Sequence, residues 1–377
     1  MVTYILKHRA ESKRPMVGRS VWMSFALALF TGCSNHPSRL EHPARFYEAW
    51  DVINQPSRLG RTFETRFENL PKSGQISKIP WSDYYWATQK AGLAFRWLNP
   101  TSSPFSYKLL SRLDALTLSD SELGKLSPAE KLDLFMGRYD FPTVISERKR
   151  SNPRAASWEG LCHGWAPAAL EFEEPRPVKV ESPQGLRIPF GSSDVKALLT
   201  WYMAFQNPLP AYGLGGRCDF SGPLGMGTAA CRDANAGAFH IVLANMIGRF
   251  KEGFVMDIAR AAEVWNQPTY AFKSREIGRQ GPSPGAALGT KQEVIVESEV
   301  NYTIEIEPQW NALDEHRERQ SVSSVVYRYR LELDAQGQIR GGDWLQDARP
   351  DFIWFQNHGT FSTASAAIQK IYEASRR

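Results

Sequence analysis

The chain has 377 residues, of which 42% are hydrophobic, 12% aromatic and 23% charged. This length corresponds to two or three domains of average size, or to one large domain. A disordered chain would have fewer aromatic residues and a more unequal charge, so the composition excludes a largely disordered protein. The mean hydropathy of −0.40 and the lack of an apolar stretch of about 18 residues exclude a transmembrane transporter.

The net charge of +5 is mostly an N-terminal feature. Residues 1–33 contain five basic residues and one acidic residue, which leaves 40 basic and 39 acidic residues in the remainder. A nucleic-acid-binding protein needs a basic patch on its folded surface. We therefore expect no nucleic acid among the partners.

The N-terminus has the features of an export signal. Residues 1–20 are basic, Val21–Gly32 is a short, mostly apolar run, and Cys33 follows directly. This order is typical of a secretory signal, and the run is too short to span a bilayer. The ending Phe30–Cys33 resembles a bacterial lipobox, although a Phe replaces the usual Leu. We expect lipidation of Cys33 and a cell-envelope location, at the outer membrane or the periplasmic face; the alternatives are plain secretion and a signal anchor.

Three cysteines remain in the exported part of the chain. Cys218 and Cys231 lie 13 residues apart in a Gly-rich loop, and disulfides persist in an oxidising compartment. Closing such a loop stabilises the fold by restricting the unfolded chain, so we expect a disulfide between them. No second Cys lies two to four residues from either, which disfavours a metal site. Cys162 is left unpaired, as a reactive thiol or as a small buried hydrophobe.

Periodicity predicts helices in the first half of the chain and strands in the last third. The expected helices cover residues 81–97, 106–116, 127–138, 193–206 and 360–375. The expected strands cover residues 253–259, 293–307, 324–334 and 338–345. The apolar segment 238–250 fits a helix or a strand.

The strongest chemical motif surrounds Cys162. Gly160 and Gly164 bracket the cysteine just before an Ala-rich run. Pro167 fits only in a first helical turn, so a helix is expected to begin close to Cys162. A thiol at a helix N-terminus feels the positive end of the helix dipole, which should lower its pKa. The motif therefore predicts a reactive thiolate.

A nucleophilic thiolate needs a His base and a group that orients this base. The adjacent His163 has poor geometry for the task. His240 lies 78 residues beyond Cys162 beside an apolar run, and Asp257 follows 17 residues later in a strand-like segment. An acid in an apolar strand needs a partner, and the order Cys, His, acid is that of papain-like enzymes. Asn266 is the competitor for the third position; a core histidine and a turn-capping aspartate are the alternatives to a triad.

Several motifs, in one order, resemble the transglutaminase elicitors of oomycetes. They are Trp158–Ala168 around the cysteine, segment 238–245 with His240, Val264–Pro268 followed by Phe272 and Lys273, and the C-terminal segments 341–344 and 349–354. The resemblance covers about residues 150–356. In the oomycete members the VWNQP sequence is also a surface signal read by plants.

The resemblance, together with the patterning, implies an α+β fold. We expect a papain-like cysteine-enzyme core with an antiparallel sheet, preceded by a smaller helical region. The expected divisions are a leader over 1–33, a tether over 34–60, a helical region over 61–150 and a catalytic domain over 151–377.

The resemblance also implies acyl transfer by a Cys/His/Asp triad, assisted by calcium. Cys162 matches the nucleophile, His240 the base and, less closely, Asp257 the orienting acid. The thiolate would attack the γ-carboxamide of a protein Gln, and a Lys amine or water would resolve the thioester. The partners would be proteins that bear Gln and Lys, and the membrane through the lipid anchor.

Other side chains are expected near the substrate or the oxyanion. They are Trp158, Trp165, Trp265 and Asn266. Trp158 and Trp165 would wall the site, with core packing as an equal alternative. No cofactor follows from the residues themselves; calcium rests on the resemblance, and Asp219, Asp233 and Asp343 are acidic candidates without calcium-loop spacing.

Two other functions compete with acyl transfer. A papain-like peptidase or amidase would use the same triad, and supplying a primary amine would distinguish it. A non-catalytic envelope lipoprotein could use the pocket for binding, although it would be free to lose the nucleophile.

Overall fold

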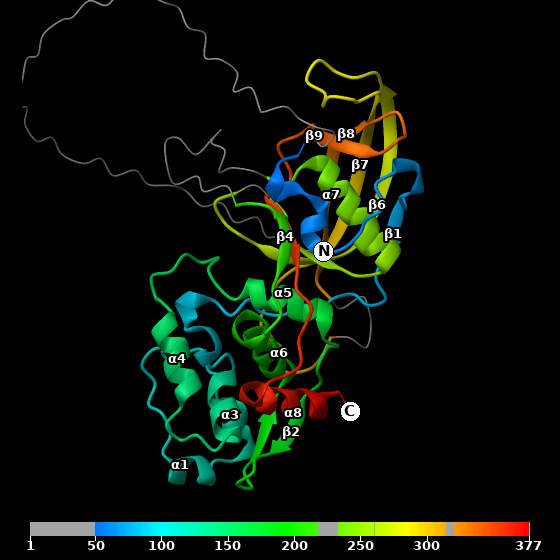
Figure 1. Ribbon diagram of the computed structural model, residues 1–377. Coiled ribbons are helices and arrows are strands. Elements are labelled where there is room, and N and C mark those ends of the chain that lie inside the picture. The colour runs from blue at the N-terminus through cyan, green and yellow to red at the C-terminus, as the bar shows by residue number, and fades with distance from the viewer. Residues whose placement is uncertain (1–49, 218–232, 260, 314–319, 377) are drawn as a thin grey trace, which may run out of the picture. The chain divides into compact units, whose positions relative to one another are not determined.

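The computed structural model describes residues 50–217, 233–259, 261–313 and 320–376. Arg45–Arg377 form one compact unit (Figure 1). The predicted leader with Cys33 lies outside the described residues, as do Cys218 and Cys231. Lipidation and the disulfide therefore stay predictions.

The last part of the predicted tether packs onto the folded body. Leu59 is 1% exposed, and Asn54 bonds to the backbone of Asp233 and Asn235 at 3.1 and 2.8 Å. The predicted helical region 61–150 likewise shares its hydrophobic core with the segments that follow. The predicted divisions at residues 60 and 150 thus lie within one compact unit.

Short α helices lie between Arg112 and Arg150. They are α1 (Arg112–Thr117), α2 (Asp120–Gly124), α3 (Pro128–Phe135) and α4 (Pro142–Arg150). The first three start with a Ser at the N-cap and an acid three residues later, and each pair bonds reciprocally to the backbone. Such capping boxes satisfy two N–H groups that the helix leaves free. The helix predicted over 127–138 is confirmed, and α4 was missed.

The helix predicted over residues 81–97 does not form. The chain makes only two 3-10 turns there, Thr88–Lys90 and Gly92–Ala94. Trp86 and Ala91 have φ angles of 51° and 62°, which no right-handed helix accommodates. Trp86 is fully buried, so tertiary packing of an aromatic anchor overrides the local helical pattern.

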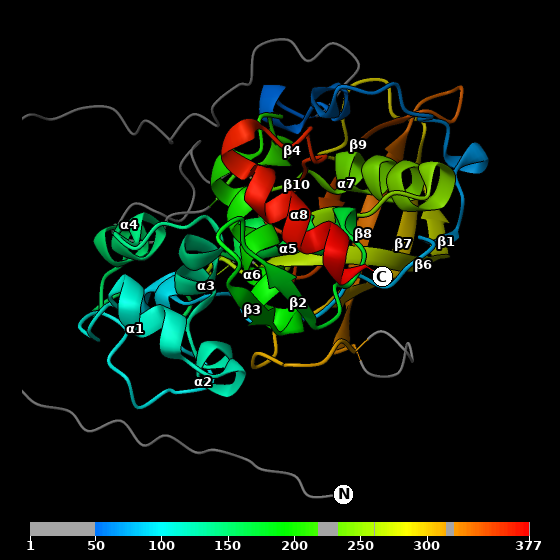
Figure 2. The same cartoon turned by 90° about the horizontal axis from the view of Figure 1, so that it is seen from below.

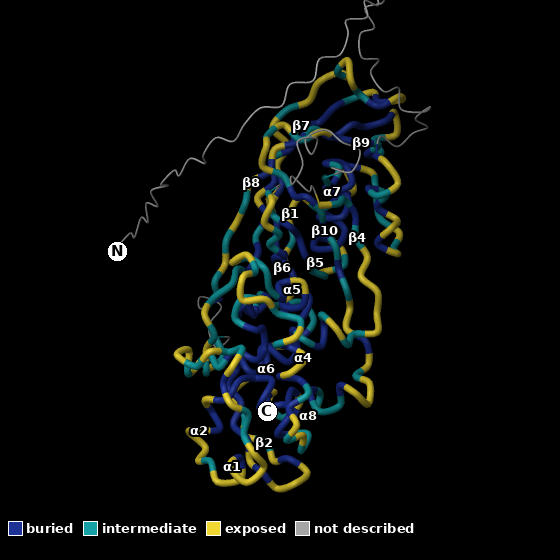
Figure 3. Tube along the Cα trace, turned by 90° about the vertical axis from the view of Figure 1, so that its left-hand side faces the viewer, coloured by how far each residue is buried: buried dark blue, intermediate teal, exposed yellow. Residues whose placement is uncertain are grey.

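The structure has two hydrophobic cores, and helices surround the first of them, the α5 core. It contains α5 (Cys162–Glu171), α6 (Ser192–Trp201) and α8 (Ala366–Ser375), which pack with α3. α6 continues as a π turn over Tyr202–Gln206. In Figure 3 the trace is mostly buried along α6 and mostly exposed along α1. The predicted helices over 193–206 and 360–375 are confirmed.

The sheet is antiparallel throughout, as predicted, in the order β4-β10-β5-β6-β7-β8-β9. The strands are β4 (Tyr212–Gly215), β10 (Phe352–Phe355), β5 (Phe254–Asp257), β6 (Asn266–Gln280), β7 (Gln292–Thr303), β8 (Val322–Leu333) and β9 (Ile339–Trp344). β1 (Ser73–Gln75) pairs with β6, and β2 (Val178–Glu181) pairs with β3 (Arg187–Phe190) in a separate hairpin. The α+β class is confirmed.

The second hydrophobic core, the α7 core, lies where α7 (Ala236–Leu243) covers the strands β8 and β9 (Figures 1 and 2). The ambiguous segment is thus a helix, continued by a π turn over Ala244–Phe250. Side chains alternate between the two faces of a strand, so adjacent residues of β5 point into different cores. Phe254 and Met256 belong to the α7 core, and Val255 belongs to the α5 core.

No helix within the described ranges combines the length and the apolar character that a membrane crossing requires.

A buried ion pair fixes α6 against α3. Lys131 Nζ lies 2.5 Å from Asp194 Oδ2, and both side chains are fully buried. We expect Lys131→Met to lower the free energy of unfolding by about 3–5 kcal/mol, because it leaves a buried carboxylate without its cation. Lys179→Met, which breaks the exposed pair with Asp120, should cost less than about 1 kcal/mol. Equal losses for the two variants in urea denaturation would contradict the assigned role of Lys131.

Candidate active site

Glycines let α5 approach its neighbours and place Cys162 at its first position. A Cβ on Gly160 would lie 2.5 Å from the carbonyl oxygen of Tyr85, and a Cβ on Gly164 would clash with the carbonyl oxygen of Thr200. Only glycine avoids these contacts without moving the backbone. The predicted helix start at Cys162 is confirmed.

Pro167 departs from the expected position, because it lies inside α5 and not in its first turn. It has no N–H to offer the carbonyl of His163 four residues earlier. The ring of His163 lies edge-on to Phe205, with 6.2 Å between the ring centroids.

The thiol of Cys162 lies between α5 and the start of β6. The residue is 5% exposed. Nδ2 of Asn266 donates to Sγ at 3.4 Å, and Sγ lies 3.8 Å from the carbonyl oxygen of Val264. The sulfur therefore has one hydrogen-bond donor and one acceptor, which suit its thiolate and thiol forms respectively.

The orientation of the Asn266 amide is set by Trp354 on β10. The indole Nε1–H of Trp354 lies 2.8 Å from Oδ1 of Asn266. An indole nitrogen can only donate, so the oxygen of the amide faces Trp354 and the NH₂ group faces Cys162. This network joins α5, β6 and β10.

The expected low pKa of the thiol is not found. Burial raises the pKa of Cys162 above its usual value, and the nearby carboxylate of Glu305 raises it further. Hydrogen bonds from Asn266 and from the backbone of His163 lower the pKa, but they offset only part of the effect of burial. The helix start alone therefore does not lower the pKa of this thiol.

Aromatic residues lie on segments next to Cys162 and Asn266: the carbonyl oxygen of Tyr85 accepts from Leu161 N–H, and Trp265 directly precedes Asn266. The rings of Tyr85 and Trp265 meet edge-to-face with centroids 5.5 Å apart, and the indole of Trp265 donates to Glu263 at 3.0 Å. The guanidinium of Arg217 lies 5.4 Å from the ring of Trp158. Trp165 is fully buried in the α5 core, so for this residue the core-packing alternative holds.

The structure does not bring His240 to the thiol. His240 lies on α7 and its ring contacts Phe67 and Tyr329, both in the α7 core. Its Nδ1 is 2.7 Å from the hydroxyl of Tyr329, and burial lowers its pKa to about 4. Cys162 belongs to the other core. The role of His240 as base stays a sequence prediction, without support from the contacts of either residue.

Asp257 does not make the predicted hydrogen bond to His240. Its Oδ1 accepts the backbone N–H of Trp265 at 3.3 Å, and no residue in the described ranges forms a hydrogen bond with its buried Oδ2. Burial, with a contribution from Asp351, raises the pKa of Asp257 to about 7. Asp257 instead pairs across the sheet with Asn266.

Asn266 was expected in a loop but is the first residue of β6. Asn266 and Gln267 are 5% and 3% exposed, so these two side chains of the VWNQP sequence face inward. Asn266 holds neither His240 nor Asp257 by its side chain; it contacts the sulfur of Cys162. The candidate site therefore consists of Cys162 and Asn266, with Trp354 behind them.

Sequence reasoning missed three residues of this site: Tyr85, Glu305 and Trp354. Trp354 was noted only as part of a C-terminal motif, and the pairing of β10 with β5 has no local signal. Glu305 lies near the end of the alternating segment 293–307, which predicts an ordinary strand. The type of a residue does not reveal that it belongs to a site when its contact partner lies on a strand that is distant in the sequence.

The described acidic candidates do not suit calcium. Arg349 bonds to the carboxylate of Asp233, and Arg330 bonds to that of Asp343. Asp219 lies outside the described residues. Within the ranges that the structure covers, no group of three or more His, Cys, Asp or Glu could hold a metal ion. We derive no step through calcium.

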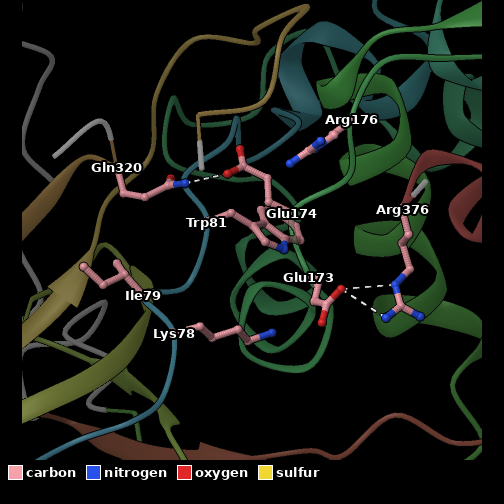
Figure 4. Close-up of a pocket in the computed structure, with 8 residues that line it drawn as sticks. All are labelled: Lys78, Ile79, Trp81, Glu173, Glu174, Arg176, Gln320 and Arg376. Carbon is pink, nitrogen blue, oxygen red and sulfur yellow. Dashed lines mark hydrogen bonds and ion pairs between the residues drawn. The ribbon is translucent and has the colours of Figure 1, made fainter. Parts of the chain in front are cut away.

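A separate hollow of about 280 Å³ lies beyond the C-terminal end of α5 (Figure 4). Most of its charges are paired: Glu173 bonds to Arg376, and Glu174 bonds to Gln320 and Lys196. Lys78 reaches into this region and donates to the carbonyl oxygen of Phe172 at 2.7 Å.

The model of the family described as "Transglutaminase elicitor" matches residues 144–372 of the chain. The chain belongs to the transglutaminase elicitor family. Its fold is similar to the crystal structure of the GP42 transglutaminase from Phytophthora sojae, with a TM-score of 0.65 and 22% sequence identity. The match covers 87% of this chain and 98% of the GP42 chain. No curated protein sequence matches the chain.

The contact between Asn266 and Cys162 makes a prediction for thiol reactivity in this family member. Asn266→Ala removes a donor that favours the thiolate, so the midpoint of iodoacetamide alkylation should move to higher pH. At pH 7 the rate should fall about tenfold, as expected for a hydrogen bond to a charged group. Trp354→Phe, which frees the amide to turn, should shift the midpoint less and in the same direction. An unchanged midpoint in Asn266→Ala would show that the amide does not act on the thiol.

Lys78 should be unusually reactive. Burial lowers its pKa to about 8, so about half of its amines are neutral at pH 8, against below about 1% for an ordinary lysine. Competitive acetylation read by mass spectrometry should label Lys78 faster than the exposed Lys251 at pH 8. The ratio should shrink at pH 11, where an ordinary lysine amine is also mostly neutral. A ratio independent of pH would contradict the lowered pKa.

Proposed function

We propose that this protein is a protein-glutamine γ-glutamyltransferase that uses Cys162 as its nucleophile. The observation that carries the proposal is the amide of Asn266, held by Trp354 and directed at the Cys162 sulfur. Membership of the transglutaminase elicitor family supports it. A cysteine that served only to fill the core would need no oriented polar partner.

The reaction begins with the thiol in its protonated form. The Cys162 sulfur forms a bond to the γ-carboxamide carbon of a protein Gln, the thiol proton passes to the amide nitrogen that will leave as ammonia, and the tetrahedral intermediate places negative charge on the former carbonyl oxygen. The NH₂ group of Asn266, 3.4 Å from the sulfur, can transfer its hydrogen bond from the sulfur to this oxygen. A preorganised donor of this kind is a large contribution to such reactions.

Collapse of the intermediate expels ammonia and leaves a thioester on Cys162. A Lys amine then attacks the thioester and forms an isopeptide bond, while attack by water gives deamidation. Tyr85 and Trp265, packed edge-to-face beside the site, limit the access of water. The proposal assigns no base from α7.

A papain-like peptidase or amidase is the second candidate. Asn266 at the sulfur is equally compatible with a peptide carbonyl as substrate, because the acyl-enzyme is common to both reactions. The product distinguishes them: a peptidase cleaves the backbone of a Gln-bearing protein, and a transferase leaves it intact.

The proposal is tested by incorporation of fluorescent cadaverine into a Gln-bearing protein such as casein. The wild-type chain should incorporate the amine and release ammonia, and Cys162→Ser should lose more than about 99% of both signals because a serine hydroxyl is a poor nucleophile here. The variant should keep its unfolding temperature. Labelling that survives in Cys162→Ser, or backbone cleavage without labelling, would contradict the proposal.

A further inference from the structure

We propose that Glu305 is the subsite for the acceptor amine: it binds the ammonium group of the incoming Lys and takes one of its protons. This inference rests on the proposed function, and it names the group that prepares the second substrate. Glu305 lies two residues beyond the end of β7.

Glu305 is held firmly beside the strand that carries Asn266. Nε2 of Gln267 lies 3.1 and 3.0 Å from its two carboxylate oxygens. The backbone is fixed on both sides, because Ile304 N–H donates to Ser321 at 2.9 Å and Ile306 N–H donates to Asp83 at 3.1 Å. Two backbone hydrogen bonds and the buried Gln267 thus position the carboxylate of Glu305, which has no part in the acylation step.

Within the part of the chain that the structure describes, no cation pairs with the carboxylate of Glu305. Among the described residues it forms no ion pair, and its side-chain partner is the neutral amide of Gln267. Burial raises the pKa of Glu305, and its charge in turn raises the pKa values of Cys162 and Tyr85. A part-buried carboxylate without a cation is costly, and near a nucleophilic thiol it opposes formation of the thiolate. An incoming ammonium ion would relieve both effects.

The chemistry of the second half-reaction needs such a group. A Lys side chain is an ammonium ion at neutral pH and cannot attack until it loses a proton. Glu305 accepts that proton, the free amine forms the C–N bond, and the C–S bond of the thioester breaks. The second proton of the amine passes to the leaving sulfur. The products are the isopeptide, the Cys162 thiol and protonated Glu305, so atoms and charge balance.

The test compares a charged and an uncharged acceptor. Glu305→Gln keeps the shape and the contact with Gln267 but removes the charge. Incorporation of cadaverine, which is cationic, should fall about 10–100-fold, as expected for a charge-assisted hydrogen bond. Hydroxamate formation with hydroxylamine, which is largely uncharged at neutral pH, and ammonia release in the absence of an acceptor should not fall, because the substitution also removes a charge that raises the pKa of Cys162.

Glu299→Gln is the matched control, because Glu299 is an exposed residue on β7 and its loss changes the net charge equally. It should leave all three rates unchanged. If Glu305→Gln does not fold, Gln267→Ala releases the carboxylate without changing the charge, and it should raise the KM for cadaverine with little effect on hydroxylamine.

Each other outcome has a defined meaning. Equal losses with cadaverine and hydroxylamine would overturn the amine subsite. Loss of ammonia release in Glu305→Gln would move Glu305 to the acylation step and overturn the proposal as well. If the wild-type chain releases no ammonia from any Gln substrate, the proposed function fails together with the subsite, which is distinct from a selective failure of Glu305.

Discussion

The contact between one side-chain amide and one sulfur determines how this site is built. Asn266 begins β6, Cys162 begins α5, and Nδ2 of the asparagine meets Sγ of the cysteine at 3.4 Å. Trp354 removes the freedom of the amide to turn. Close packing of α5 makes the contact possible, and this packing depends on Gly160 and Gly164. One helix, two strands and two glycines thus together position this hydrogen bond.

The electrostatics of this arrangement favour the protonated form of the Cys162 thiol. Burial and Glu305 raise the pKa of Cys162, and the donors of Asn266 and His163 counteract them in part. Such a thiol is protected from oxidation and alkylation, which require the thiolate. In the proposed reaction, charge appears only with the substrate: the oxyanion meets Asn266, and the ammonium ion of the acceptor meets Glu305. The proposed site is then complementary to the reacting groups and not to the free thiolate.

Patterns with a local physical cause were predicted well from the sequence. The helix that Ser127 caps and the alternating strands β7 and β8 follow from residues that are close together along the chain. The helix start at Cys162 was also predicted, although Pro167, on which that prediction rested, lies further inside α5. Most of the site could not be predicted in this way. His240 satisfied the spacing of a base, but alternation along β5 places the two cores on opposite sides, so His240 faces Tyr329. Trp354 reaches Asn266 only because β10 pairs with β5.

Direct detection of the acyl-enzyme tests most simply whether this buried cysteine is the nucleophile of an acyl transferase. The wild-type chain is mixed with a Gln-bearing peptide in the absence of an amine, quenched in acid, digested with pepsin and analysed by mass spectrometry. The peptic fragment that contains Cys162 should carry the peptide's mass less one ammonia, and hydroxylamine should remove this adduct. An adduct on another residue, or release of ammonia without any adduct on Cys162 at the shortest accessible times, would contradict this assignment.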